Sequence, residues 1–199
     1  MEATAKIAAV VLAAGASSRM GRHKLLLELG GESLLRRAVR RVSAAGFEQV
    51  VVVLGRDGPQ LERELRGLAV QCALNPNYER GLGTSFRAGI EALAPAIEAI
   101  VFTHADRPFL TSEHFRTVVD AYVARLAPVV ASRYGDVIAP PHLVRRDLTA
   151  EMATNESSVR PLLQRPDVIF VDLPEFALFD VDEPSDYERA KVLIRAEPL

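Results

Sequence analysis

The chain of 199 residues is predicted to form one α/β domain whose central sheet is mainly parallel. Short apolar runs, typical of strands covered on both faces, alternate with segments in which apolar residues recur at helical spacing. Repeated strand–helix units of this kind give parallel strands with helices on both faces of the sheet. A hydrophobic content of 49% is enough to bury one core, and no repeat, low-complexity stretch or linker divides the chain.

The elements follow from local patterns. Strands are predicted at residues 7–12, 50–54, 70–74, 99–103, 129–132, 168–171 and 178–181. Helices are predicted between an N-cap at Ser33 and Gly46, after Pro59, at residues 84–93, behind an N-cap at Thr111 or Ser112, and from Pro184 onward. Four arginines lie between the apolar positions of the first helix and are interpreted as its solvated face: Arg36, Arg37, Arg40 and Arg41.

The composition excludes several classes of function. The net charge is −2, and no segment combines clustered Lys and Arg with aromatic residues, so no nucleic-acid partner is expected. The single cysteine, Cys72, excludes an internal disulfide and fits a reducing compartment. No apolar run approaches the length of a membrane span, and the N-terminus lacks the organisation of a signal peptide. We therefore expect a cytoplasmic protein with no membrane partner.

The first predicted strand leads into a basic loop of small residues. This loop contains Arg19 and Lys24, and its Gly, Ala and Ser residues let backbone N–H groups approach a phosphate closely. Five residues separate Gly15 from Gly21, and two more precede Lys24, so the spacing excludes a Walker P-loop. The glycines of a dinucleotide-binding turn are also absent. The loop predicts a nucleoside triphosphate site of another kind.

Two further loops follow predicted strands, at the edge of the sheet where ligands bind in such folds. In residues 75–89, glycines allow close approach, and Thr84 and Ser85 begin a helix with free N–H groups; this pattern suits a base or ribose but also an ordinary capped loop. Asp106 and Asp182 could hold Mg²⁺ together with phosphate oxygens, or serve only as turn and helix-start residues. Combined with the basic loop, they form the minimum set for metal-assisted phosphoryl chemistry.

The sequence resembles a known family at these positions. The run Leu-Ala-Ala-Gly-Ala-Ser-Ser-Arg-Met-Gly at residues 12–21, with Lys24, resembles the signature of MobA-like nucleotidyltransferases, and among them of molybdenum cofactor cytidylyltransferases. Segments 75–89, 103–110 and 180–187 also resemble that group and occur in the same order. The resemblance spans about residues 6–192.

This resemblance implies a single-domain, Rossmann-like nucleotidyltransferase fold of the GT-A type. It implies a nucleotide-binding half at about residues 6–110 and an acceptor-binding half at about 111–192. In the implied reaction, a terminal phosphate attacks the α-phosphorus of a nucleoside triphosphate and releases pyrophosphate.

Roles carry over by motif position. Lys24 and Arg19 would be catalytic because they would neutralise the triphosphate, and Asp106 and Asp182 would bind Mg²⁺. The base and sugar would be held by Leu12, Ala13, Ala14, Gly15, Asn75, Gly81, Gly83, Thr84 and Ser85. Ala14 stands where guanylyltransferase relatives have glycine, so CTP is favoured over GTP as the substrate.

Residues 135–160 depart from the family pattern, because the glycines common in relatives are missing. His142 and Arg160 would approach the acceptor, although His142 could also be an ordinary surface or packing residue. His104, between a strand and Asp106, could act directly or only support its neighbours.

The implied acceptor is molybdopterin, and the product would pass to a molybdenum hydroxylase. Two alternatives remain open. One is a related enzyme that uses GTP or another acceptor, such as a sugar phosphate, or a glycosyltransferase with the Asp-x-Asp sequence at residues 180–182. The other is a non-catalytic nucleotide- or cofactor-binding maturation factor for a molybdenum enzyme.

Overall fold

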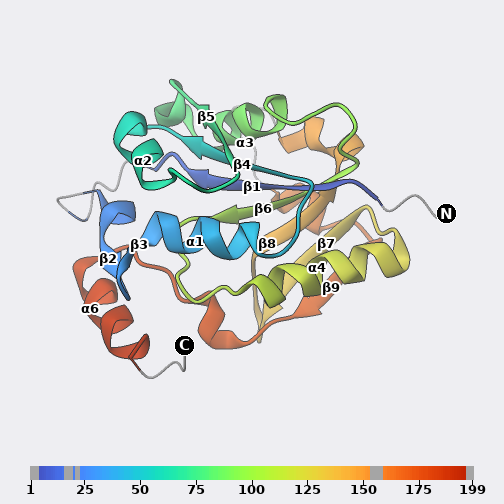
Figure 1. Ribbon diagram of the computed structural model, residues 1–199. Coiled ribbons are helices and arrows are strands. Elements are labelled where there is room, and N and C mark those ends of the chain that lie inside the picture. The colour runs from blue at the N-terminus through green and yellow to red at the C-terminus, as the bar shows by residue number, and fades with distance from the viewer. Residues whose placement is uncertain (1–4, 16–19, 21–22, 153–158, 196–199) are drawn as a thin grey trace.

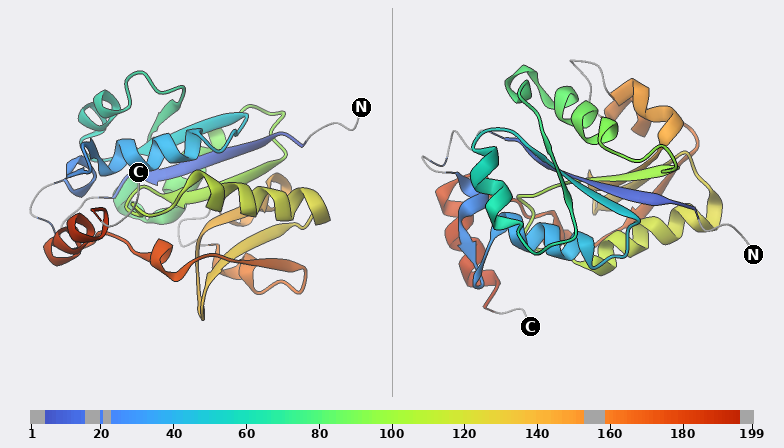
Figure 2. Two further views of the ribbon diagram at one scale, coloured as in Figure 1. Left: turned by 60° about the horizontal axis from the view of Figure 1, so that its bottom comes forward. Right: turned by 45° about the horizontal axis from the view of Figure 1, so that its top comes forward.

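The computed structural model describes residues 5–15, 20, 23–152 and 159–195. Within these residues the chain forms a seven-stranded central sheet with helices on both faces (Figures 1 and 2). The strand order is β5 (Gln71–Leu74), β4 (Gln49–Leu54), β1 (Ile7–Ala13), β6 (Ala99–His104), β8 (Val137–Arg145), β7 (Val129–Tyr134) and β9 (Val168–Asp172). No helix in the described ranges is long and apolar enough to cross a membrane.

The sheet is mostly parallel, which confirms the predicted fold class. Strands β5, β4, β1 and β6 pair in parallel, and so do β7 and β9. Strand β8 runs antiparallel to both of its neighbours, β6 and β7. The parallel half therefore gathers the carboxyl ends of β1, β4 and β6 at one edge of the sheet, where the basic loop begins.

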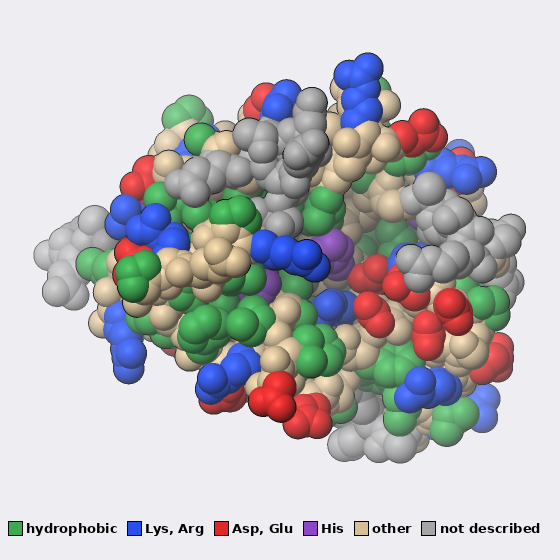
Figure 3. Space-filling view, turned by 180° about the vertical axis from the view of Figure 1, so that it is seen from behind, with side chains coloured by type: hydrophobic (Ala, Val, Ile, Leu, Met, Phe, Trp, Pro, Cys, Tyr) green, Lys and Arg blue, Asp and Glu red, His purple; other side chains and the backbone are tan. Residues whose placement is uncertain are grey.

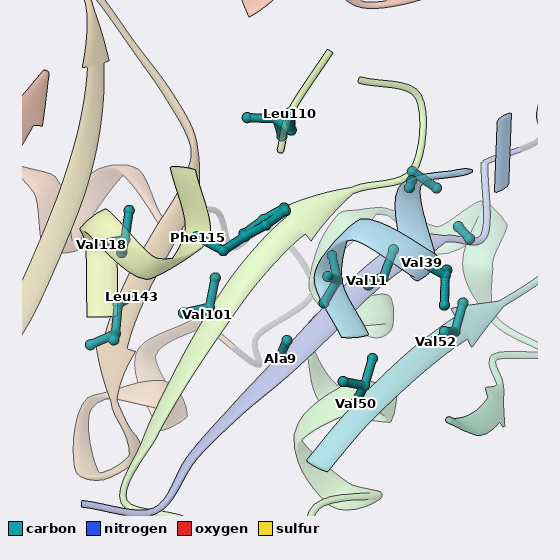
Figure 4. Packing of buried hydrophobic residues seen from close by; sticks show 14 of the residues in the cluster. Ala9, Val11, Val39, Val50, Val52, Val101, Leu110, Phe115, Val118 and Leu143 are labelled. Atoms are coloured by element: carbon teal, nitrogen blue, oxygen red, sulfur yellow. The ribbon is translucent and has the colours of Figure 1, made fainter. Parts of the chain in front are cut away.

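Helices cover the sheet through two separate apolar cores, because side chains alternate along each strand. On one face, Ala9 and Val11 of β1 pack with α1 (Leu34–Ser43), α2 (Gly58–Glu64) and α4 (Ser112–Arg125). Figure 4 shows this face, with Val39 of α1 and Phe115 of α4 over the strands. On the other face, the intervening β1 residues pack with α3 (Leu82–Glu91) and α5 (Arg160–Leu163).

A third, smaller core lies beside the sheet. It joins the short β2–β3 hairpin (Glu28–Leu29 and Glu32–Ser33) to α6 (Pro184–Leu193), and it contains Leu29, Phe109 and Ala190. The Tyr187 hydroxyl donates a hydrogen bond of 2.6 Å to the Glu28 carbonyl, which links the two elements directly. The C-terminal helix is thereby held next to the segment that carries Lys24.

Strand β8 is absent from the sequence prediction because two consecutive prolines argue against a central strand. The structure accommodates Pro140 and Pro141 where the β7–β8 register shifts, between Ala131 and Arg133. Side chains of β7 donate to the proline carbonyls here: Ser132 Oγ donates to the Pro141 carbonyl at 2.6 Å, and the Tyr134 hydroxyl donates to the Pro140 carbonyl at 2.9 Å. Side-chain donors thus satisfy the two proline carbonyls where the backbone register is interrupted.

Two other predictions are wrong. Residues 178–181 do not form a strand, because a 3₁₀ turn occupies Glu175–Leu178 and the chain then leaves the sheet beyond its edge strand β9. The arginines of α1 are also not a uniformly solvated face. Only Arg40 is exposed, whereas Arg37 is 6% exposed and Arg36 and Arg41 are half-buried, because all three donate to backbone carbonyls of neighbouring loops.

We predict that Gly89→Ala destabilises the protein although alanine favours helices. A Cβ at Gly89 would lie 2.5 Å from Val10 Cγ1 and 3.1 Å from Val53 Cγ2, and both valines are fully buried on the sheet. Overpacking of this kind costs about 1–3 kcal/mol, which exceeds the helix-propensity gain of up to about 1 kcal/mol. Urea unfolding measures the change.

Gly58→Ala is the matched control for this substitution. Its added Cβ would meet Leu74 Cδ2 at 2.7 Å, but the Leu74 side chain is 62% exposed and can move. We expect the free energy of unfolding of this variant to change by less than about 1 kcal/mol. Equal losses in the two variants would contradict the packing argument.

Candidate active site

A cavity of about 330 Å³ lies at the carboxyl ends of β1 and β6. It is lined by Leu12, Ala13, Ala14, Gly15, Lys24, Leu25, Tyr78, Glu79, Gly81, Leu82, Ser85, His104 and Asp106. The three loops that the sequence singled out therefore meet at one place. Seen from behind the view of Figure 1, histidine side chains lie near the middle of the surface, next to a group of acidic side chains (Figure 3).

One wall of the cavity depends on a glycine that sequence reasoning missed. Gly55 follows β4, and a Cβ there would lie 2.6 Å from the Ala14 carbonyl oxygen and 2.9 Å from Tyr78 Cγ. Only a residue without a side chain lets the end of β1 and the Tyr78 ring lie so close together. A glycine directly after the apolar run of β4 is the sequence signal that could have revealed this wall.

The loop before α3 divides the predicted nucleotide-binding residues into two groups. Asn75, which is 4% exposed, donates from Nδ2 to Thr84 Oγ1 and Ser85 Oγ, both at 2.9 Å. Its Oδ1 accepts a bond of 3.0 Å from the Asn77 amide. Asn75 therefore fixes the start of α3. Gly81 and Ser85 line the main cavity, whereas Asn75 and Thr84 line a separate hollow of about 190 Å³.

Gly83 is buried in the first turn of α3 and is not among the residues that line either space. The predicted role of Arg19 falls on a residue outside the described ranges. The structure therefore brings the predicted residues Leu12, Ala13, Ala14 and Gly15 to one cavity with Lys24, Gly81 and Ser85.

Lys24 lies between the two predicted metal ligands. Its Nζ is 2.7 Å from Asp106 Oδ2 and 2.6 Å from Asp182 Oδ1. Lys24 is in the 3₁₀ turn Lys24–Leu26, Asp106 follows β6, and Asp182 precedes α6. A backbone hydrogen bond of 3.0 Å from the Val181 amide to the Asp106 carbonyl holds the two aspartate segments side by side.

The charges of this group stabilise one another. Burial acts to lower the pKa of Lys24, but Asp106 and Asp182 outweigh that effect and raise it. Burial likewise acts to raise the pKa of Asp106, and the Lys24 ammonium outweighs it and lowers the pKa. Burial and the charges of Asp106 and Asp182 raise the pKa of Asp180. At neutral pH the site therefore holds a charged Lys24 beside an ionised Asp106.

The two carboxylates suit a magnesium ion by their chemistry and convergence. Oxygens of Asp106 and Asp182 approach one cationic nitrogen within 2.7 Å, so both point at a single position that favours positive charge. Mg²⁺ is commonly bound by one or two carboxylates, with phosphate and water oxygens completing its shell. Across the described residues, no group of three or more His, Cys, Asp or Glu side chains offers a closed metal site. An open site of two carboxylates leaves room for a substrate.

A second cavity of about 420 Å³ adjoins the first and brings His142 and Arg160 together. The other lining residues are Leu12, Leu82, Phe86, Phe102, His104, Ile138, Pro140, Val159 and Leu163. Three of these residues, Leu12, Leu82 and His104, also line the first cavity, so they form the partition between the two. From the sequence, His104 could act directly or only support its neighbours. In the structure it lines both cavities.

His142 is not a surface residue. It lies on β8 opposite Phe102 of β6 and is 2% exposed. Burial, with smaller contributions from the charges of Arg107 and His104, lowers the pKa of His142 to about 3. Burial also lowers the pKa of His104. The wall of the second cavity therefore carries neutral imidazoles at physiological pH.

Comparisons with known proteins agree with the fold and with the resemblance seen in the sequence. The family model for a MobA-like NTP transferase domain matches residues 9–168. The molybdenum cofactor cytidylyltransferase of Escherichia coli is 28% identical over 187 residues, which are 92% of this chain and 94% of that protein. The crystal structure of a nucleotidyl transferase from Methanothermobacter superposes with a TM-score of 0.83 at 24% identity and covers 96% of this chain and 99% of that one.

Another relative is much longer than this chain. The bifunctional IPC transferase and DIPP synthase of Rubrobacter xylanophilus is 38% identical over 108 residues. That match covers 51% of this chain and only 25% of the relative. The shared part is therefore about a quarter of that protein's length.

We predict that His142 makes the protein less stable in acid. The unfolded chain protonates this histidine below its ordinary pKa of 6.5, whereas the folded protein does so only near pH 3, so protons favour unfolding between these values. Lowering the pH from 7.5 to 5.0 should reduce the free energy of unfolding of the wild type by about 2 kcal/mol more than that of His142→Gln. Urea unfolding at both pH values measures this difference. Between pH 7.5 and 8.5 the gap between the two proteins should stay constant, and equal losses at pH 5.0 would contradict the prediction.

Proposed function

Because the chain belongs to the MobA-like NTP transferase family, we propose that it transfers a cytidylyl group from CTP to the terminal phosphate of molybdopterin. The observation that carries this proposal is the Lys24–Asp106–Asp182 group, of which Lys24 and Asp106 line the first of two adjoining cavities. One cavity would hold the nucleotide and the other the acceptor. The choice of molybdopterin is supported by the molybdenum cofactor cytidylyltransferase of Escherichia coli, which matches over 92% of the chain.

In the proposed reaction, an oxygen of the acceptor's terminal phosphate attacks the α-phosphorus of CTP. The new phosphorus–oxygen bond forms while the bond to the bridging oxygen breaks, and the electron pair leaves with pyrophosphate. Such a transfer needs little covalent help from the protein, so positioning and charge neutralisation supply most of the catalysis.

Lys24 would neutralise the triphosphate. Its ammonium bonds to Asp106 and Asp182 here, and when Mg²⁺ takes these carboxylates its three protons would be directed at phosphate oxygens instead. Asp106 and Asp182 would hold Mg²⁺, which supplies further positive charge to the phosphates when bound. The partition of Leu12, Leu82 and His104 would keep the acceptor ring apart from the cytosine while the two phosphates meet.

The two cavities draw on different parts of the chain. Residues 6–110 supply every residue that lines the nucleotide cavity, and His142 and Arg160 of the acceptor cavity come from the second half of the chain. We propose that His142 accepts or donates a neutral hydrogen bond and that Arg160 attracts the charge of the acceptor. After transfer, the product would pass to a molybdenum hydroxylase.

A second acceptor class has its own support. Residues 136–160 contain no glycine, so this part of the chain departs from the sequence pattern that implies molybdopterin. Transfer to a sugar phosphate is therefore the alternative to test beside molybdopterin. The experiment incubates the protein with Mg²⁺, each of the four nucleoside triphosphates, and either acceptor, and measures pyrophosphate.

We expect pyrophosphate only with CTP and molybdopterin together. Faster release with GTP would overturn the base assignment, and release with a sugar phosphate alone would overturn the acceptor. Tight nucleotide binding without turnover under any condition would leave the non-catalytic maturation factor as the function.

Lys24→Ala should lower the rate of pyrophosphate release by about 10²–10³, by analogy with the loss of a single electrostatic donor. The matched control is Lys191→Ala, because Lys191 pairs with Glu188 and lies over the Tyr187 ring of the same helix, and it lines neither cavity. The control should keep the wild-type rate. Wild-type activity in Lys24→Ala would remove this lysine from the mechanism.

Ala14→Gly should shift the base preference toward GTP. The Ala14 methyl group borders the nucleotide cavity, and its removal makes room for a larger base. We expect the ratio of kcat/KM for GTP to that for CTP to rise at least about tenfold, the usual scale for one methyl-sized change in a pocket. Ala105→Gly, which follows β6 and lines neither cavity, reports the general cost of a glycine at this end of the sheet. An unchanged ratio in Ala14→Gly would refute the size argument.

A further inference from the structure

In the loop that carries Asp106, the carbonyl groups of Pro108 and Leu110 are bonded by side chains and not by a strand ladder. After β6 the chain runs through Pro108, Phe109 and Leu110, all of them buried. Buried carbonyls need donors, and this loop belongs to no strand ladder. The donors that the structure supplies come from the side chains of α1.

Two arginines of α1 make these bonds. Arg37 Nε donates to the Pro108 carbonyl at 3.0 Å, and Arg41 Nη1 donates to the same carbonyl at 2.7 Å and to the Leu110 carbonyl at 2.9 Å. Arg37 is 6% exposed, and its charge is balanced by Glu32, whose Oε1 lies 3.6 Å from Nη1. Two guanidinium groups are thus committed to one short loop.

The loop in turn determines where both aspartates lie. The Asp106 carbonyl accepts the hydrogen bond from the Val181 amide, one residue before Asp182, so a shift of the loop moves both carboxylates. Helix α1 follows closely after Lys24, and the Leu34 amide bonds to the Leu27 carbonyl at 2.9 Å. The bonds from Arg37 and Arg41 therefore connect the lysine side of the site to the aspartate side.

We propose that Arg37 and Arg41 are positioning residues that set the spacing of Asp106 and Asp182 by holding the carbonyls of Pro108 and Leu110. As far as it concerns metal binding and catalysis, this inference rests on the proposed function. The arginines touch neither cavity, so they act through the loop and not on a substrate. Groups that orient metal ligands from behind typically change metal affinity or activity by 10–100-fold when altered.

Helix α1 offers a matched control. Arg36 Nη1 also donates to two backbone carbonyls, those of Glu64 at 2.7 Å and Arg66 at 3.1 Å, but these lie at the end of α2 and just after it and line neither cavity. Arg36→Lys and Arg41→Lys therefore remove the same kind of two-carbonyl contact and keep the same charge. Only the second contact belongs to the Asp106 loop.

The experiment compares wild type, Arg36→Lys and Arg41→Lys by three measurements. The first is amide hydrogen exchange at residues 105–110 and 180–183, the second is calorimetric titration of Mn²⁺ in the presence of CTP, and the third is kcat for pyrophosphate release. We expect Arg41→Lys to exchange the Val181 amide at least about tenfold faster, to bind Mn²⁺ 10–100-fold more weakly and to lose kcat by a similar factor. Arg36→Lys should match wild type in all three measurements, although its Tm should fall by about as much as that of Arg41→Lys.

Two outcomes would overturn the inference. One is that Arg36→Lys and Arg41→Lys have equal exchange rates at the Val181 amide and equal affinities for Mn²⁺. The other is that the losses in Arg41→Lys are no larger than its lower Tm accounts for, as in Arg36→Lys. Failure of the proposed function looks different. In that case the wild type itself neither binds Mn²⁺ with CTP nor releases pyrophosphate, and the exchange rate of the Val181 amide alone decides whether the arginines hold the loop.

Discussion

The ammonium group of Lys24 joins three segments that are far apart in the sequence, because it bonds to Asp106 and Asp182 at 2.7 and 2.6 Å. Without it, two carboxylates would lie close together in a partly buried place and repel one another. The β1 end, the loop after β6 and the start of α6 all take their positions around this group. The charge balance at this point thus organises the whole carboxyl edge of the sheet.

The rest of the fold supports that edge from behind. Parallel pairing of β4, β1 and β6 brings the strand ends into line, and the two apolar cores leave these strands little freedom to shift. Strand β8 extends the sheet in the opposite direction and brings His142 next to Phe102. The strands of the parallel half therefore line the first cavity, and the antiparallel strand β8 contributes residues to the second.

The sequence predicts the parallel half of the sheet and the loops at its edge, because continuous apolar runs and strand-end motifs are local signals. It does not predict β8, because its two prolines lie at a register shift and their carbonyls are bonded by the Ser132 and Tyr134 side chains of another strand, which no local signal shows. Asp182 is predicted at the end of a strand that does not exist, yet it reaches the site through the Val181 amide. The burial of Arg37 also escapes prediction, since helical spacing says which residues share a face but not which loop packs there.

The shared partition of Leu12, Leu82 and His104 has a consequence for the fate of the product. Two substrates that occupy adjoining cavities can each leave alone, but a molecule made by joining them would fill both cavities at once. Its dissociation would then require both sets of contacts to break together, which lengthens its residence on the protein. Under the proposed reaction, the slow step would be departure of the dinucleotide, and a receiving enzyme that draws it out would set the pace of turnover.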